Sequence, residues 1–205
     1  AAETGTPVFL PSYRLAPEHP FPAAIEDTVA GFRWLLDNGF PAENIVVSGD
    51  SAGGNLALQL VAHLEQTGET MPAGVVLMSP WVDLDFSDMS ARDKAKKDPF
   101  LALAMAKLCR TQYAPDTSDD DPRISPINYT PSPDWPPFLI QCGGAENFAG
   151  GIARMAEKFA EHGVTHEFQL WPDQFHVFQV FHPLVPEAKI AVRDIGSFIR
   201  GCLRS

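Results

Sequence analysis

Short apolar runs alternate with amphipathic segments along most of the chain. Five segments are predicted to be β-strands, and those at 45–48, 75–78 and 138–141 each contain at least three consecutive apolar residues, as buried parallel strands do. The other two predicted strands lie at 8–10 and 166–171. Helical spacing of apolar residues predicts helices at 22–38, directly after residue 51, at 152–162 and at 187–202. This alternation is typical of a parallel sheet with helices on both faces, so we predict an α/β fold.

One long segment, 84–136, interrupts the alternation. No run between Asp83 and Pro137 predicts a strand, but 99–113 has helical spacing, and the residues after it are rich in Asp, Ser and Pro. Long excursions of this kind are usually lids or binding loops. We therefore predict a single domain, 1–205, with a cap- or lid-like excursion at 84–136.

Composition narrows the classes of partner. The chain has 205 residues, 45% of them hydrophobic, which suits one globular domain with a sizeable core. A net charge of -11 argues against binding to nucleic acid or to an anionic membrane surface. The short basic run at 92–97 is interrupted by Asp93, and we interpret it as a solvated helix face. No stretch approaches the ~18 apolar residues of a membrane span.

The cysteines favour a reducing compartment. Cys109, Cys142 and Cys202 are widely spaced, and they form neither a CxxC pair nor a disulfide framework. We therefore expect a cytoplasmic location, with Cys142 as a buried strand residue.

A G-x-S-x-G motif provides the first candidate chemistry. The sequence Gly49-Asp50-Ser51-Ala52-Gly53 lies directly after a predicted strand and directly before a predicted helix. In that context the turn is called a nucleophile elbow, and the flanking glycines are expected to be required by close packing. Ser51 is then the candidate nucleophile, while the N–H of Ala52 and the helix dipole favour a developing oxyanion. The alternative is that these glycines only make a tight turn.

Longer motifs identify a family resemblance. Residues 13–24 read YRLAPEHPFPAA and residues 49–57 read GDSAGGNLA; shorter matches follow at 79–83, 125–127 and 136–137. Together they resemble the hormone-sensitive-lipase-like esterases. The resemblance implies an α/β-hydrolase fold with a partial helical cap, and it implies hydrolysis of small-molecule esters with short to medium acyl chains. It implies no metal or organic cofactor, and homodimerisation is possible.

The resemblance also assigns the base and the acid that a serine nucleophile needs. In this fold the order along the chain is serine, acid, histidine. His176 occupies the family's place for the base, after the last strand, and His182 on the same loop is a weaker candidate. Glu146 occupies the place of the acid, where relatives usually carry Asp.

Two other carboxylates remain alternatives for the acid. Asp83 follows the third predicted strand, a position from which some α/β-hydrolases supply their acid. Asp173 lies three residues before His176, where we expect it to stabilise a turn. The sequence therefore favours Glu146 and keeps Asp83 as the main alternative.

The chain also departs from the family. Relatives carry a His-Gly-Gly-Gly type motif upstream of the segment at 13–24, and its backbone N–H groups complete the oxyanion hole. No such motif occurs in this chain, and one lost oxyanion donor typically costs ~3 kcal/mol of transition-state stabilisation. We therefore expect a piece of a longer protein, without its N-terminal strands, that alone is unstable or inactive.

Two functions other than ester hydrolysis fit the same motifs. Plant hormone receptors that resemble this family keep the elbow but lose the catalytic base, so the scaffold can also bind small molecules. A non-catalytic remnant is the other possibility, because the oxyanion motif is missing. The presence of His176 favours the enzyme.

Overall fold

A single parallel sheet organises the protein. The structure, a computed structural model, describes residues 1–95 and 98–203. Neighbouring strands pair in the order β1 (Val46–Asp50), β2 (Gly74–Met78), β3 (Phe138–Gly143) and β4 (His166–Trp171). The helices are α1 (Ala23–Asp37), α2 (Ala52–Thr67), α3 (Ser87–Ala95), α4 (Leu103–Tyr113), α5 (Ala149–Glu161) and α6 (Pro186–Cys202). Short 3-10 helices are η1 (Ala42–Asn44), η2 (Pro126–Asn128) and η3 (Phe178–Phe181).

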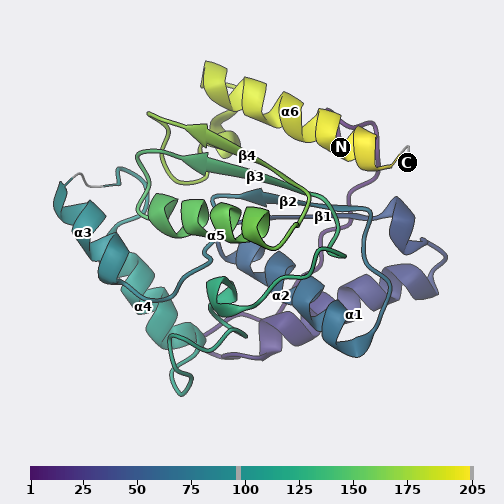
Figure 1. Cartoon of the computed structure of the whole chain (residues 1–205), viewed down its shortest axis with the longest axis horizontal. Coiled ribbons are helices and arrows are strands. Elements are labelled where there is room, and N and C mark those ends of the chain that lie inside the picture. The colour runs from purple at the N-terminus through teal and green to yellow at the C-terminus, as the bar shows by residue number, and fades with distance from the viewer. Residues whose placement is uncertain (96–97, 204–205) are drawn as a thin grey trace.

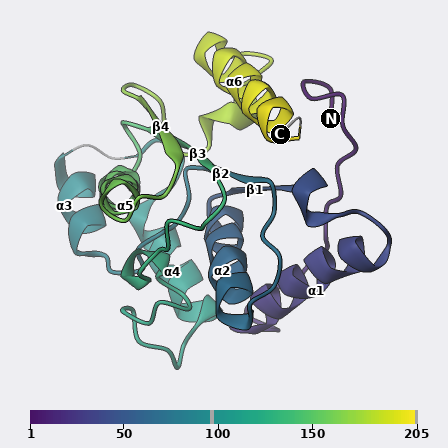
Figure 2. The ribbon, with the colours of Figure 1, turned by 45° about the vertical axis from the view of Figure 1, so that its right-hand side comes forward.

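Helices cover both faces of this sheet, as the alternating pattern predicts. Helix α6 lies over one face, while α2 and α5 lie over the other and α1 packs outside α2 (Figures 1 and 2). Side chains of successive strand residues point to opposite faces. Val75 and Leu77 of β2 accordingly join the cluster beneath α2 and α5, whereas Val76 packs against Ile195 of α6. The predicted α/β fold is confirmed.

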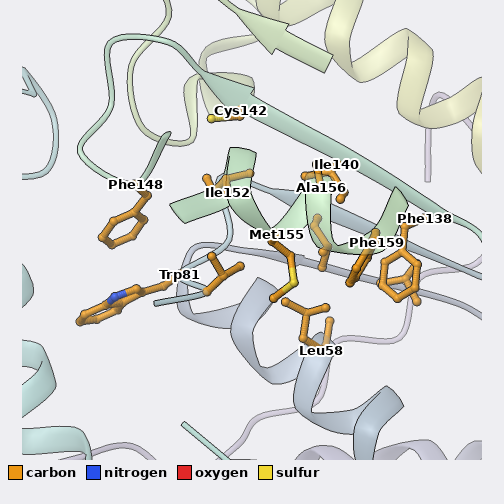
Figure 3. Close-up of a cluster of buried hydrophobic side chains, with 14 of the residues drawn as sticks. Leu58, Trp81, Phe138, Ile140, Cys142, Phe148, Ile152, Met155, Ala156 and Phe159 are labelled. Carbon is orange, nitrogen blue, oxygen red and sulfur yellow. The ribbon is translucent and has the colours of Figure 1, made fainter. Parts of the chain in front are cut away.

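The larger core lies between the sheet and helices α2 and α5. Phe138 and Ile140 of β3 pack against Ile152 and Phe159 of α5 (Figure 3). Leu58 of α2 belongs to the same buried cluster. All five side chains are buried. Burial of one such side chain stabilises the fold by ~1.5–3 kcal/mol. This layer therefore holds in place the strands whose ends carry the candidate site.

The predicted strand at 8–10 is wrong. These residues have no regular secondary structure, and Val8 and Leu10 are mostly exposed. Phe9 instead stacks on Trp34 of α1, with ring centroids 5.2 Å apart. A strand forms only where its backbone groups find a partner. Within the described residues no segment pairs with the free edge of β1.

The excursion at 84–136 is helical where it is regular. In its described part it contains α3, α4 and η2 but no strand, as expected. Helix α4 begins at Leu103 rather than at 99, because the carboxylate of Asp98 accepts the N–H groups of Phe100 and Leu101 and forms a turn. None of the helices in residues 1–95 and 98–203 is long and apolar enough to cross a membrane.

The interpretation of 92–97 as a solvated helix face is wrong for Arg92. Its side chain is half-buried and donates hydrogen bonds to backbone carbonyls of another loop. A guanidinium group has several donors in a fixed fork, so it can hold two carbonyls at once. Lys96 and Lys97 lie outside the described residues.

Candidate active site

Ser51 occupies a strained turn between β1 and α2. Its φ is 51° and its ψ is −117°, a conformation that non-glycine residues rarely adopt. The preceding Asp50 is exposed at the end of β1. A Cβ on Gly49 would lie 2.2 Å from the carbonyl oxygen of Gly53, so only glycine fits at that position. The turn therefore has the geometry that the G-x-S-x-G motif predicts.

The second glycine that packing requires is Gly54, not Gly53. A Cβ on Gly53 would meet nothing within 4 Å, so the expected collision at this position is wrong. At Gly54 a Cβ would lie 2.7 Å from Cβ of Pro80, in the loop after β2. Gly53 is only half-buried in the first turn of α2, whereas Gly54 is buried against the loop after β2.

His176 lies beside the candidate nucleophile. Its Nε2 is 2.9 Å from Ser51 Oγ, a hydrogen bond in which the hydroxyl donates when Nδ1 carries the imidazole proton. The side chain is buried, and its ring packs edge-on against Phe148 at 4.9 Å. His182, the weaker candidate, is exposed further along the loop.

Glu146 faces the other nitrogen of the same imidazole. Its Oε1 lies 3.8 Å from His176 Nδ1, and both atoms are buried without a hydrogen-bond partner. Its Oε2 accepts hydrogen bonds from the hydroxyl of Ser79 at 2.6 Å and from the N–H of Gly143 at 3.0 Å. The distance of 3.8 Å is too long for a hydrogen bond, but two buried and unpartnered polar atoms face each other across it.

The other two carboxylates lie elsewhere. Asp83 accepts a hydrogen bond from Arg154 at 2.7 Å, and it forms an ion pair there. Asp173 is exposed in the turn before His176. Within the described residues, Glu146 is the one carboxylate within 4 Å of a ring nitrogen of His176.

Residues of the excursion hold the loop that carries Glu146. Arg92 donates to the carbonyl oxygens of Gly144 at 2.9 Å and of Glu146 at 3.2 Å. Asp98, also buried, accepts the N–H of Asn147 at 3.1 Å. Sequence reasoning missed both residues, because neither belongs to a motif and their partners lie about fifty positions away in the chain.

Helix α2 begins directly after Ser51. Ala52 is exposed as the first residue of the helix, and the first N–H groups of a helix have no partner within it.

Phe100 of the excursion lies near His176 and Phe175, with ring centroids 6.4 and 6.0 Å away, and forms an apolar wall. No group of three or more His, Cys, Asp or Glu residues that could hold a metal ion occurs in the described part of the chain.

Comparisons with known proteins identify the family of this chain. A family model described as the alpha/beta hydrolase fold matches residues 1–180. An esterase of Acinetobacter venetianus is 37% identical over 97% of this chain, and an acetyl-hydrolase of Streptomyces hygroscopicus is 34% identical over 96%. This chain spans 65% of the length of each.

A solved structure gives the same result. The crystal structure of an esterase from the bacterial hormone-sensitive lipase family is 35% identical, with a TM-score of 0.88 over 94% of this chain and 64% of that one. Sequence motifs, fold and elbow geometry thus point the same way. The chain belongs to the α/β-hydrolase fold family, and within it to the hormone-sensitive-lipase-like group.

Proposed function

We propose that the protein hydrolyses carboxylic esters through an acyl-enzyme on Ser51. The observation that carries this proposal is the distance of 2.9 Å between Ser51 Oγ and His176 Nε2, at a strained strand-to-helix turn. A serine hydroxyl becomes a useful nucleophile when an adjacent base takes its proton. The relatives named esterase and acetyl-hydrolase support the same reaction class.

The first half of the reaction acylates Ser51. Ser51 Oγ attacks the acyl carbon while Nε2 of His176 takes the hydroxyl proton. The carbonyl oxygen becomes an oxyanion, which the N–H of Ala52 and the N-terminus of α2 stabilise. When the intermediate collapses, the C–O bond to the alcohol breaks, and His176 returns the proton to the leaving oxygen.

The second half releases the acid. Water attacks the acyl carbon and gives one proton to Nε2 of His176, and this proton then returns to Ser51 Oγ as the acyl–serine bond breaks. Glu146 keeps the imidazole proton on Nδ1 and stabilises the imidazolium ion in both halves. Its present distance of 3.8 Å from Nδ1 is compatible with this role, because catalytic hydrogen bonds often tighten only in the complex with substrate.

The substrate is proposed to be an ester with a short to medium acyl chain. This follows from the resemblance, and the name of the Streptomyces relative specifies an acetyl group for that protein. The exposed ring of Phe100 offers an apolar surface beside His176 where an acyl or alcohol group can pack. A series of p-nitrophenyl esters from acetate upwards, compared by kcat/KM, tests the chain length; a maximum at long acyl chains would contradict it.

Covalent labelling tests the nucleophile directly. A fluorophosphonate probe should label the protein, and Ser51→Ala and His176→Ala should both abolish labelling while far-UV circular dichroism stays unchanged. Labelling that persists in Ser51→Ala would refute the assignment. A folded protein that is never labelled would instead favour a small-molecule-binding protein, or a remnant that is inactive because it lacks the His-Gly-Gly-Gly oxyanion motif.

A matched pair of variants tests the acid. Glu146→Gln should lower kcat by up to about 10⁴-fold, since the triad carboxylate orients the base. Asp83→Asn is the control, because it also neutralises a carboxylate but one that pairs with Arg154. If Glu146→Gln kept the original rate and Asp83→Asn lost it, the assignment of the acid would be wrong.

A further inference from the structure

Ser79 occupies an unusual position at the end of β2. It follows Met78, the last residue of the strand, and its side chain is fully buried. Its φ is 48°, in the left-handed region, and the next residue is Pro80, which disfavours helical backbone conformations in the residue before it. The surrounding structure must therefore hold the backbone there, and such strain often accompanies functional sites.

The hydroxyl of Ser79 connects three loops. It donates to Oε2 of Glu146 at 2.6 Å and accepts the N–H of Val177 at 3.1 Å. One hydroxyl can do both, because it has one proton and two lone pairs. Ser79 follows β2, Glu146 follows β3 and Val177 follows β4, so the loops after three neighbouring strands meet at this oxygen.

The two hydrogen bonds act on Glu146 and on the backbone directly after His176. Occupying Oε2 of Glu146 leaves Oε1 to face Nδ1 of His176. The other bond fixes the backbone of Val177, which also has a positive φ of 52°, directly after His176. A Glu side chain has one more rotatable bond than Asp, so it gains more from a fixed partner.

We propose that Ser79 is a positioning residue that aligns Glu146 with His176. In the described residues its hydroxyl bonds to Glu146 and Val177, and it acts through these two partners. This inference rests on the proposed function, in which Glu146 and His176 serve as acid and base. The sequence singled out Ser79 only as part of a family motif, without a role.

Two substitutions at Ser79 separate the hydroxyl from the backbone. Ser79→Ala removes both hydrogen bonds, and Ser79→Gly does so with a residue that favours a positive φ, so at least one variant should fold. We expect both to lower kcat for a p-nitrophenyl ester by about 10- to 100-fold, as a misplaced catalytic group does. KM should stay within about twofold, because substrate contacts are not involved.

Ser125 provides the matched control. It is equally buried, and its hydroxyl accepts the N–H of Leu84 at 2.9 Å, so Ser125→Ala also deprives a backbone N–H of its acceptor. It should lose stability without a comparable loss of kcat. Equal losses of kcat in Ser79→Ala and Ser125→Ala would mean that Ser79 has only a structural role.

A double-mutant cycle tests the route through Glu146. In a Glu146→Ala background, Ser79→Ala should lower kcat much less than in the unchanged protein, because the carboxylate it aligns is gone. Multiplicative losses in the two single variants and the double variant would overturn the proposal.

A spectroscopic readout does not depend on turnover. In protein labelled with ¹⁵N-histidine, Nδ1–H of His176 should give a downfield proton signal, and Ser79→Ala should shift or broaden it. If the unchanged protein hydrolyses no ester, the proposed function fails, yet this signal still tests the alignment. An identical signal in Ser79→Ala, or none in the unchanged protein, would contradict the proposal.

Discussion

Replacing Gly49 by alanine should damage the turn that carries Ser51. The added Cβ would lie 2.2 Å from the carbonyl oxygen of Gly53 and 2.7 Å from the N–H nitrogen of Gly54. Comfortable contacts between such atoms are about 3.5 Å, so the turn must open by roughly 1 Å. Both obstacles are backbone atoms that cannot rotate away, so we expect a loss of ~1–3 kcal/mol of stability.

The same displacement should reduce activity. A shift of about 1 Å in a catalytic group can lower the rate about 100-fold. Urea unfolding followed by tryptophan fluorescence measures stability, and the rate of fluorophosphonate labelling measures the position of Ser51. Gly49→Ala should be worse in both assays than the unchanged protein.

Gly53→Ala is the matched stability control. It changes the other glycine of the motif, but its Cβ would enter open space. Because it replaces glycine within α2, it should keep or raise stability, by up to about 1 kcal/mol. The reasoning would be refuted if Gly53→Ala destabilised the protein as much as Gly49→Ala, or if neither did.

Three further changes probe the core, one ion pair and the thiols. Phe159→Ala should cost ~3–5 kcal/mol in urea unfolding, because its ring is fully buried; a cost below about 1 kcal/mol would contradict the packing. The hydrogen bond from Arg33 lowers the pKa of Glu69 to about 2, so the pair stabilises the fold above the ordinary pKa of 4.5 and loses this effect as pH falls toward 2. Arg33→Gln should thus have a modestly lower urea midpoint at neutral pH, and this deficit should shrink on acidification; a deficit independent of pH would argue against the pair. Burial raises the pKa of the Cys142 thiol, so a thiol reagent should modify exposed Cys109 in the folded protein but Cys142 only in urea, as peptide mapping would show.

Local signals in the sequence were sufficient for most of the architecture. Strands β1 to β4 and the long helices lie within a few residues of their predicted ranges. Apolar periodicity reflects which face a segment buries, and that can be read from the segment itself. The elbow could also be predicted from local sequence, because Gly49 and Ser51 lie within one tight turn.

Errors arose where a feature depends on a distant partner. The segment at 8–10 is apolar enough for a strand, yet a strand also needs a neighbour with which to pair. Gly53 and Gly54 are adjacent in sequence, and only the position of Pro80 shows which of them must lack a side chain. The sequence pattern predicts a solvated charge at Arg92, but in the fold its side chain bonds to the backbone of the loop that carries Glu146.

The sequence by itself determined the fold class, the family and the turn that presents Ser51, because these follow from short motifs and periodic patterns. The sequence placed Glu146 at the family's position for the acid but kept Asp83 as an alternative, and the tertiary structure decided which of the two lies beside His176. In the fold, Asp83 forms an ion pair with Arg154, whereas Glu146 faces the imidazole of His176. Ser79 gained its partners in the same way, since contacts between residues 67 and 98 positions apart form only when neighbouring strands align their ends.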